Sequence, residues 1–337
     1  MNILVVGAGS IGTRHVKNML ALGYKDINIA VCDPDLKKLK LIAEYGNFTI
    51  YQNLKTALKI GQSSNLDKNK PDVVFVCNPT HAHVLTARAA LDIGAHVFIE
   101  KPLSHNMVGI DALIKKAEKK KKTVMIACNY RFNKGFEELE KIVRTETFGK
   151  PLTALAVIGS DVLKSRVGNY KNTYAASKKQ GGGVILDSCS HAVEYISWLF
   201  GKVVAVKASA KNIRKIAGVD VEDYVSMFLQ HDSGVMTTII SDYFSRPKKN
   251  FLEIQFQNGR AKWDFTQNTV ESIDVASDKS VVKKIYKDTE KEHARNDMYI
   301  DELRYFFRTI KDGKRPVQDL RRARSIMRVL ISAKKNS

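Results

Sequence analysis

The sequence has few cysteines, no long apolar run and too little acidic charge to balance its basic residues. Its four cysteines, Cys32, Cys77, Cys128 and Cys189, lie far apart in 337 residues, and no Cys-x-x-Cys pair suggests a zinc or redox site. No apolar run approaches the roughly 18 residues that a membrane helix needs. The apolar residues that follow Met1 at once leave no room for a signal peptide. We therefore expect a reducing, cytoplasmic location, no metal site and no membrane partner.

Acidic residues are scarce: 35 Asp and Glu stand against 55 Lys and Arg, which gives a formal net charge of +20. Such an excess could attract nucleic acid, an anionic membrane surface or phosphorylated small molecules. The basic residues are spread along the chain, however, and the densest run, residues 115–122, has no aromatic residues between its lysines. That run is typical of the solvated last turns of a helix, where the helix dipole favours cations. We expect no nucleic-acid partner.

The first feature that is present is a strand–helix–strand unit of the kind that binds dinucleotides. A predicted strand at 3–6 leads into a Gly-x-Gly-x-x-Gly motif, then a helix and a second strand at 27–32. The first glycine allows a tight turn, the second admits a pyrophosphate, and the third lets helix and strand pack closely. The phosphates then lie at the helix N-terminus, where free N–H groups favour anions. The predicted cofactor-binding residues here are Gly7, Gly9, Ser10, Ile11 and Gly12.

The second strand of this unit ends at Asp33, which lies 21 positions after Gly12. A carboxylate at this place accepts the hydroxyls of the adenosine ribose. Its charge would repel a 2′-phosphate, so we expect NAD in preference to NADP. The nearby Lys37 and Lys38 make that preference moderate.

Strands and helices alternate as far as residue 127, and this predicts an α/β Rossmann domain with a doubly wound parallel sheet over residues 1–127. From 128 to 337 the apolar residues alternate with period two, hairpin turns such as Asn258-Gly259 appear, and helices return at the end. We predict an α+β domain with a large, mostly antiparallel open sheet over 128–337.

Three polar groups are candidates for chemistry. Lys101 follows a predicted strand, where an ammonium could stabilise the alkoxide that forms as hydride leaves carbon. Asp187 and His191 stand four apart after Gly181-Gly182-Gly183, so a helix would place them on one face, with the carboxylate orienting the imidazole. An ordinary strand-exit turn and a solvated helix face are the alternatives.

Four further residues are candidates for binding substrate. Asn129 and Arg131 follow the last Rossmann strand, and the guanidinium could bind a carboxylate or phosphate. Tyr170 and Tyr174 precede the three glycines and are plausible sugar contacts. Ordinary surface or interdomain packing is the alternative for all four.

These motifs together resemble a known family in their order and spacing. They are the glycine motif at 7–12, Asn78-Pro79-Thr80-His81-Ala82-His83, Glu100-Lys101-Pro102, and Gly183-x-x-x-Asp187-x-x-x-His191. The set is similar to that of the glucose–fructose oxidoreductase, inositol dehydrogenase and rhizopine catabolism (Gfo/Idh/MocA) family of NAD(P)-dependent oxidoreductases. The resemblance implies a Rossmann domain, followed by a substrate-binding domain whose open sheet often serves oligomerisation. A homodimer or homotetramer is therefore expected.

The resemblance also assigns roles. Lys101 would polarise the substrate oxygen, His191 would act as general acid or base, and Asp187 would orient His191 or a neighbouring sugar hydroxyl. Many relatives carry glycine where this chain has Cys189, which leaves the local backbone spacing open. His83 could equally be a satisfied histidine at a helix start. Positions that line the cofactor in relatives are Asn78, Pro79, His83 and Glu100.

The expected reaction moves hydride between nicotinamide C4 and a secondary alcohol or ketone of a sugar, a cyclitol or a nucleotide-linked sugar or amino sugar. Two alternatives remain. A redox-assisted glycosidase would use the same residues, although the lack of a secretion signal argues mildly against it. A non-catalytic regulator that binds NAD and a sugar could dispense with Lys101, Asp187 and His191, and their retention argues against that class.

Overall fold

The computed structural model describes residues 1–337 apart from 25–26, 60–69, 166–169, 286–290 and 336–337. The chain folds into two compact units. The first comprises Met1–Ala127 and Tyr299–Arg324, and the second comprises Cys128–Met298 and Ser325–Ser337. The first break, after Ala127, falls where the sequence pattern changes. The later breaks fall inside the two C-terminal helices, so part of the C-terminal region belongs with the first unit.

The first unit contains a six-stranded parallel sheet in the order β3-β2-β1-β4-β5-β6. Its central strands are fully buried; the four residues of β4 are each 0% exposed, because helices cover both faces of such a sheet. The strands are β1 (Asn2–Val6), β2 (Asn28–Cys32), β3 (Thr49–Tyr51), β4 (Val73–Val76), β5 (His96–Ile99) and β6 (Val124–Ile126). The helices are α1 (Ser10–Ala21), α2 (Leu36–Ala43), α3 (Leu54–Lys59), α4 (His83–Asp92) and α5 (Ile110–Lys120). The predicted doubly wound Rossmann fold is confirmed.

The core of the first unit includes residues from the far end of the chain. Phe306 lies in helix α10 (Lys291–Lys311), and its ring packs 5.2 Å from Phe98 and 5.9 Å from Phe75, between centroids. Phe75 and Phe98 are themselves stacked at 4.9 Å. The C-terminal segment thus completes the hydrophobic core of the parallel sheet.

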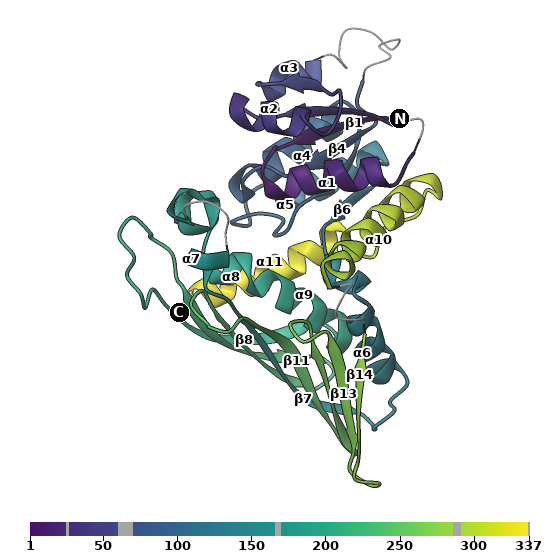
Figure 1. Ribbon diagram of the computed structural model, residues 1–337, viewed down its shortest axis with the longest axis vertical. Helices are drawn as coiled ribbons and strands as arrows, with labels where there is room; N and C mark the ends of the chain where they lie inside the picture. Colours follow the sequence, from purple (N-terminus) through teal and green to yellow (C-terminus); the bar gives the residue numbers. More distant parts are fainter. Residues whose placement is uncertain (25–26, 60–69, 166–169, 286–290, 336–337) are drawn as a thin grey trace. The chain divides into compact units, whose positions relative to one another are not determined.

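The second unit is built on an eight-stranded sheet in the order β14-β13-β12-β11-β7-β10-β9-β8 (Figure 1). Neighbouring strands are antiparallel except β7 and β10, which run parallel. The predicted hairpin at Asn258-Gly259 joins β11 to β12, with Leu252 opposite Trp263. The strands are β7 (Pro151–Gly159), β8 (Val203–Lys211), β9 (Tyr224–His231), β10 (Met236–Asp242), β11 (Lys249–Phe256), β12 (Gly259–Asp264), β13 (Thr269–Asp274) and β14 (Lys279–Lys284). The predicted, mostly antiparallel open sheet is confirmed.

Helices cover one face of this sheet. Trp263 of β12 packs against Phe136 of α6, at 5.5 Å between ring centroids, and against Tyr195 of α9, at 5.8 Å. The burial of alternate residues along β9, β11 and β12 follows from this one-sided cover. The helices of this unit are α6 (Lys134–Arg144), α7 (Val162–Ser165), α8 (Val184–Asp187) and α9 (Cys189–Phe200), and helix α11 (Leu320–Lys335) is shared between the units.

Candidate cofactor site and catalytic residues

The glycine motif forms the tight connection between β1 and α1. Gly7 has φ +105°, and a Cβ there would lie 2.5 Å from the Cys77 carbonyl oxygen. A Cβ on Gly12 would lie 1.9 Å from the Gly7 carbonyl oxygen, so only glycine fits both places. At Gly9, the N-cap of α1, an added Cβ meets no described atom within 4 Å. Helix α1 begins at Ser10, followed by Ile11, and the space beside its N-cap is open. A pyrophosphate there could accept hydrogen bonds from the free N–H groups of the first turn.

Asp33 lies just after β2, and its carboxylate is held by backbone. One oxygen accepts a hydrogen bond from the Ala8 N–H at 2.8 Å, and the other accepts one from the Asp35 N–H at 2.9 Å. The Lys38 ammonium lies 4.0 Å away. Because each carboxylate oxygen has a further lone pair, the group can still accept a ribose hydroxyl. The residues present fit a dinucleotide.

The loop after β4 carries Asn78, Pro79 and, at the start of α4, His83. The Asn78 side-chain amide donates to the Thr86 hydroxyl at 2.8 Å. The His83 ring is buried, with Nε2 at 2.8 Å from the Asn78 carbonyl oxygen and Nδ1 at 2.9 Å from the Pro102 carbonyl oxygen. Burial lowers the pKa of His83, and the two carbonyls and the Glu100 charge offset part of this. Both ring nitrogens face protein acceptors, so the geometry favours the satisfied helix-start histidine over a direct cofactor contact.

Glu100, directly after β5, is also engaged by protein. Its Oε1 lies 2.6 Å from Nε2 of His15, a fully buried residue of α1. Burial raises the pKa of Glu100, but the hydrogen bond and charge of His15, with the charge of Lys101, outweigh it and bring the pKa below its ordinary value. Sequence reasoning missed His15; the signal was its position three residues after Gly12, on the buried face of α1. Lys101 follows Glu100 and is partly exposed.

In the second unit, Asp187 is buried at the end of α8, and its carboxylate accepts hydrogen bonds from two phenols. The Tyr174 hydroxyl donates to Oδ1 at 2.9 Å, and the Tyr243 hydroxyl donates to Oδ2 at 3.0 Å. Tyr174, predicted to contact substrate, is thus a partner of the carboxylate. Tyr243, which follows β10, was missed because nothing local in the sequence connects it with residue 187. The two phenols fix the plane of the carboxylate.

His191 lies in the first turn of α9, partly exposed. It does not share one unbroken helix with Asp187: Ser188 separates α8 from α9, although its dihedral angles (φ −90°, ψ −47°) remain near helical values. The Tyr130 ring packs edge-on against the His191 ring at 4.8 Å between centroids. The imidazole is therefore supported on one side and accessible on another.

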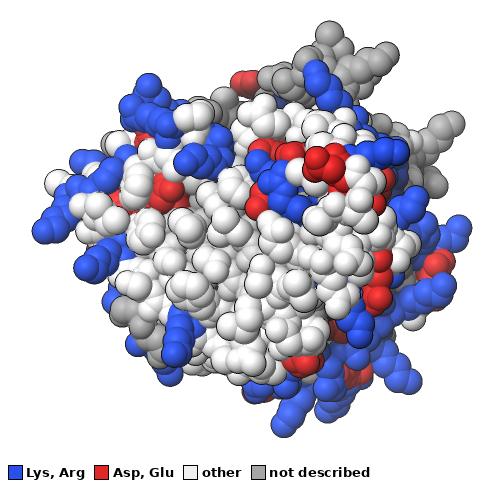
Figure 2. Space-filling model, turned by 90° about the horizontal axis from the view of Figure 1, so that it is seen from below, with Lys and Arg blue, Asp and Glu red and all other residues white. Residues whose placement is uncertain are grey.

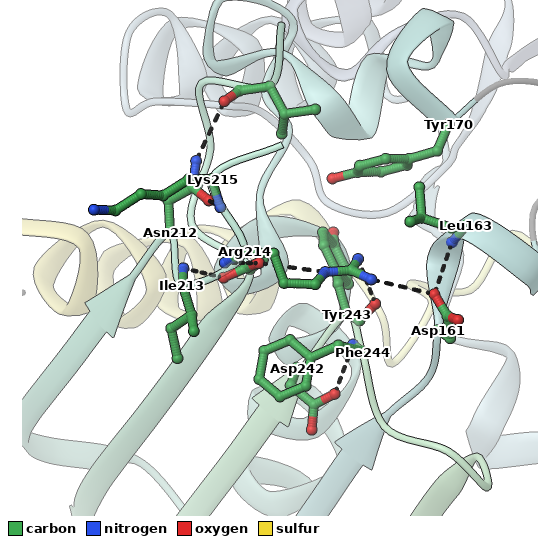
Figure 3. Close-up of polar contacts among 12 residues, drawn as sticks. Asp161, Leu163, Tyr170, Asn212, Ile213, Arg214, Lys215, Asp242, Tyr243 and Phe244 are labelled. Atoms are coloured by element: carbon green, nitrogen blue, oxygen red, sulfur yellow. Dashed lines mark hydrogen bonds and ion pairs between the residues drawn. The ribbon is translucent and has the colours of Figure 1, made fainter. Parts of the chain in front are cut away.

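The backbone of Tyr243 is anchored by a charged cluster at the end of the sheet (Figure 3). The Arg214 guanidinium donates to the Tyr243 carbonyl oxygen at 2.9 Å and to the Asp161 carboxylate at 3.3 Å. The Tyr243 N–H donates to the Asp223 carbonyl oxygen at 2.9 Å, and the Asp223 carboxylate accepts the Arg214 N–H at 3.0 Å. These contacts leave the Tyr243 phenol little freedom beside Asp187.

Three of the four predicted substrate-binding residues have structural contacts instead. Arg131 is buried, donates from Nε to Glu194 at 2.6 Å, and stacks 3.9 Å from the Trp198 ring centroid. The Asn129 amide is buried and donates to the Met298 sulfur at 3.5 Å. Tyr170 is buried, and its hydroxyl donates to a backbone carbonyl. For Arg131 the packing alternative is favoured, because the Glu194 carboxylate already neutralises the guanidinium. The contacts of Asn129 and Tyr170 are compatible with packing, and their role toward substrate stays a prediction.

The described residues offer no arrangement for a metal site, a membrane-spanning helix or a reactive cysteine. No group of three or more His, Cys, Asp or Glu within them is arranged to hold a metal ion, and no described helix is long and apolar enough to cross a bilayer. Burial raises the pKa of the Cys189 thiol far above its ordinary value, which makes it a poor nucleophile. A cleft of about 290 Å³ in the first unit is lined by none of the predicted site residues.

The fold and the glycine cradle define a protein built around a dinucleotide-binding unit. Residues 1–128 match the family model described as "Oxidoreductase family, NAD-binding Rossmann fold", and residues 136–262 match the "GFO/IDH/MocA C-terminal domain". The chain therefore belongs to the Gfo/Idh/MocA family of NAD-binding oxidoreductases, as the sequence motifs predicted.

Several relatives are named as dehydrogenases. The chain is 25% identical to the myo-inositol 2-dehydrogenase of Thermotoga maritima, over 94% of this chain and 90% of that protein. It is 23% identical to the D-glucoside 3-dehydrogenase of Escherichia coli, over 78% of this chain and 69% of that protein. Among solved structures, levoglucosan dehydrogenase in complex with NADH and levoglucosan has a TM-score of 0.84 at 17% identity, covering 100% of this chain and 98% of that one. The last likeness shows a shared fold.

Proposed function

We propose that the protein transfers hydride between NAD and a secondary alcohol or ketone of a sugar, a cyclitol or a nucleotide-linked amino sugar. The observation that carries the proposal is the buried Asp187 carboxylate, whose two oxygens accept hydrogen bonds from Tyr174 and Tyr243. A carboxylate fixed in this way can orient an imidazole or a substrate hydroxyl through its remaining lone pairs. Family membership, and the names of the inositol and glucoside dehydrogenases, support a polyhydroxylated substrate.

In the proposed reaction, Lys101 donates a hydrogen bond to the substrate oxygen and stabilises the negative charge that develops on it. His191 takes the hydroxyl proton as general base, and Asp187 orients His191 or a neighbouring hydroxyl. NAD, held by the glycine loop and Asp33, would supply the hydride acceptor at nicotinamide C4. The substrate carbon thus loses one hydride, its oxygen loses one proton, and a carbonyl forms; ketone reduction is the reverse.

For the cofactor, we propose contacts with the glycine loop, with Asp33 at the adenosine ribose, and with the loop of Asn78 and Pro79. The open space at Gly9 and the fixed carboxylate of Asp33 support this assignment. Glu100 also remains a candidate cofactor contact, because its Oε1 is bonded to His15 and its other lone pairs can still accept. His83 is the weaker candidate, since both of its ring nitrogens face backbone carbonyl oxygens.

The redox-assisted glycosidase remains the second candidate. The similarity to the D-glucoside 3-dehydrogenase of Escherichia coli favours it, because such an enzyme needs the same oxidation as its first step. A glycosidase would release an aglycone without net accumulation of NADH, whereas a dehydrogenase would accumulate NADH in proportion to product.

The test is a panel of sugars, cyclitols, glycosides and nucleotide sugars, assayed for NADH and NADPH formation and for aglycone release. Lys101→Ala and His191→Ala should each lose most turnover on the best substrate, while Tyr170→Phe, a buried tyrosine whose hydroxyl donates to the Ala175 carbonyl oxygen, should retain it. Wild-type turnover in both the Lys101 and His191 variants would refute the assignment. A chain that binds NAD and sugar but turns over nothing on the panel would favour the regulator.

We further propose that the open face of the eight-stranded sheet forms a homo-oligomer interface. Figure 2 shows a broad area of uncharged residues on the underside of the molecule, bordered by Lys and Arg. The strand positions that face away from the covering helices include Phe228 and Met236, which are 56% and 47% exposed. An uncharged area that includes exposed apolar side chains such as these is typical of a protein interface.

A further inference from the structure

Two buried histidines lie against the residues on either side of Lys101. His15, 0% exposed, reaches from α1, and His83, 2% exposed, is the first residue of α4. Neither belongs to the group of residues that the proposed reaction uses. Their contacts fall on Glu100 and Pro102, the two chain neighbours of Lys101.

The contact on the N-terminal side is the hydrogen bond between His15 Nε2 and Glu100 Oε1, at 2.6 Å. The imidazole is enclosed by aromatic rings, with centroids 5.6 Å away for Phe75 and 5.2 Å for Phe98. In apolar surroundings a hydrogen bond to a carboxylate is strong, because water does not compete for either partner. Glu100 is thereby fixed to the same helix that follows the glycine loop.

The contact on the C-terminal side is a bridge between two loops. His83 Nδ1 lies 2.9 Å from the Pro102 carbonyl oxygen, and Nε2 lies 2.8 Å from the Asn78 carbonyl oxygen. Carbonyl oxygens only accept, so the ring donates one of these hydrogen bonds when neutral and both when protonated. The protonated ring thus bonds the loop after β5 to the loop after β4, whereas the neutral ring bonds one of them and packs against the other.

We propose that His15 and His83 are positioning residues for Lys101: together they fix the backbone on both sides of the lysine, so that its ammonium meets the substrate oxygen. The inference rests on the proposed function of Lys101. It predicts that both histidines act on turnover through the lysine and have no separate role in the reaction.

The test is a double-mutant cycle. His15→Gln and His83→Gln should each lower kcat about tenfold or more while changing the dissociation constant for NAD less than about threefold. In the Lys101→Ala background, measured by single turnover, the same substitutions should cause no further loss, because the group that they position is gone. Equal losses in the two backgrounds would overturn the inference.

The matched control is His231→Gln in the second unit. His231 is 1% exposed and bonds the Gly201 carbonyl oxygen and the Thr237 hydroxyl, both at 3.1 Å, so it reports the effect of losing a buried histidine as such. Thermal melts show which variants fold. Where a glutamine variant does not fold, His83→Asn or His15→Asn takes its place in the cycle, and a wild-type kcat in a folded variant overturns the inference.

The two proposals fail in distinguishable ways. Wild-type turnover in Lys101→Ala contradicts the proposed function itself. Loss in Lys101→Ala with wild-type kcat in both histidine variants contradicts only the positioning role.

Discussion

Replacing Tyr243 by Phe removes one of the two hydroxyl donors to Asp187 and keeps the ring. The hydrogen bond is 3.0 Å long, and the tyrosine is 1% exposed, so water cannot easily replace the lost donor. Hydrogen bonds to charged groups contribute about 1.5–3 kcal/mol. We expect the free energy of unfolding to fall by about 2 kcal/mol. If the same bond holds the carboxylate in its working orientation, kcat/KM should fall by about ten- to a hundredfold, since about 1.4 kcal/mol corresponds to a factor of ten.

The assay pairs steady-state kinetics on the best substrate with denaturant unfolding. Tyr170→Phe is the control: its buried hydroxyl donates to the Ala175 carbonyl at 3.4 Å, a long bond, and its ring packs 5.9 Å from that of Tyr243. It should lose less than about 1 kcal/mol of stability and no activity. A Tyr243→Phe protein with wild-type kcat/KM and reduced stability would refute the idea that the phenol orients Asp187 for catalysis.

Three further predictions follow from single contacts. Asp33→Asn keeps an oxygen for the Ala8 N–H but loses the charge, so the NADP-to-NAD ratio of kcat/KM should rise; unchanged ratios and NAD affinity would contradict the ribose assignment. The pKa of Glu100 is lower in the folded protein than its ordinary 4.5, so its charge stabilises the fold above that pH, and the contribution is lost as the pH falls through the folded-state pKa. The free energy of unfolding of the Glu100→Gln variant should therefore depend less on pH, below about pH 4.5, than that of the wild type. An equal pH dependence of the two proteins would count against the His15 hydrogen bond. Phe228→Asp on the open sheet face should reduce the mass measured by light scattering, and an unchanged mass would move the oligomer interface elsewhere.

The sequence predicts local backbone geometry well. The glycine cradle, Asp33 and the strand ends depend on residues close together in the chain, where backbone geometry is dictated by residue type. The change to an antiparallel sheet after residue 128 was visible in the period of the apolar residues. Hairpins such as that at Asn258-Gly259 were visible for the same reason.

The sequence did not reveal side-chain hydrogen bonds between residues that lie far apart in the chain. Tyr243 lies 56 positions from Asp187, and His15 lies 85 from Glu100, so no spacing rule connects them. The sequence favoured Arg131 as an anion-binding group because it is a cation that follows a strand end, where ligands bind in parallel sheets. Its partner Glu194, 63 positions later, is a side chain that only tertiary structure brings to it.

The ring of Phe306 has a consequence for synthesis of the chain on the ribosome. Phe75 and Phe98 are translated early, but the side chain that packs on both of them comes from α10, near the end. The parallel sheet therefore emerges with part of its apolar surface uncovered and stays so until α10 has been made. A fragment ending at residue 127 would retain that exposed surface permanently, and we expect it to aggregate unless α10 is supplied. In this protein the parallel-sheet unit is completed only after the strands of the eight-stranded sheet have been made.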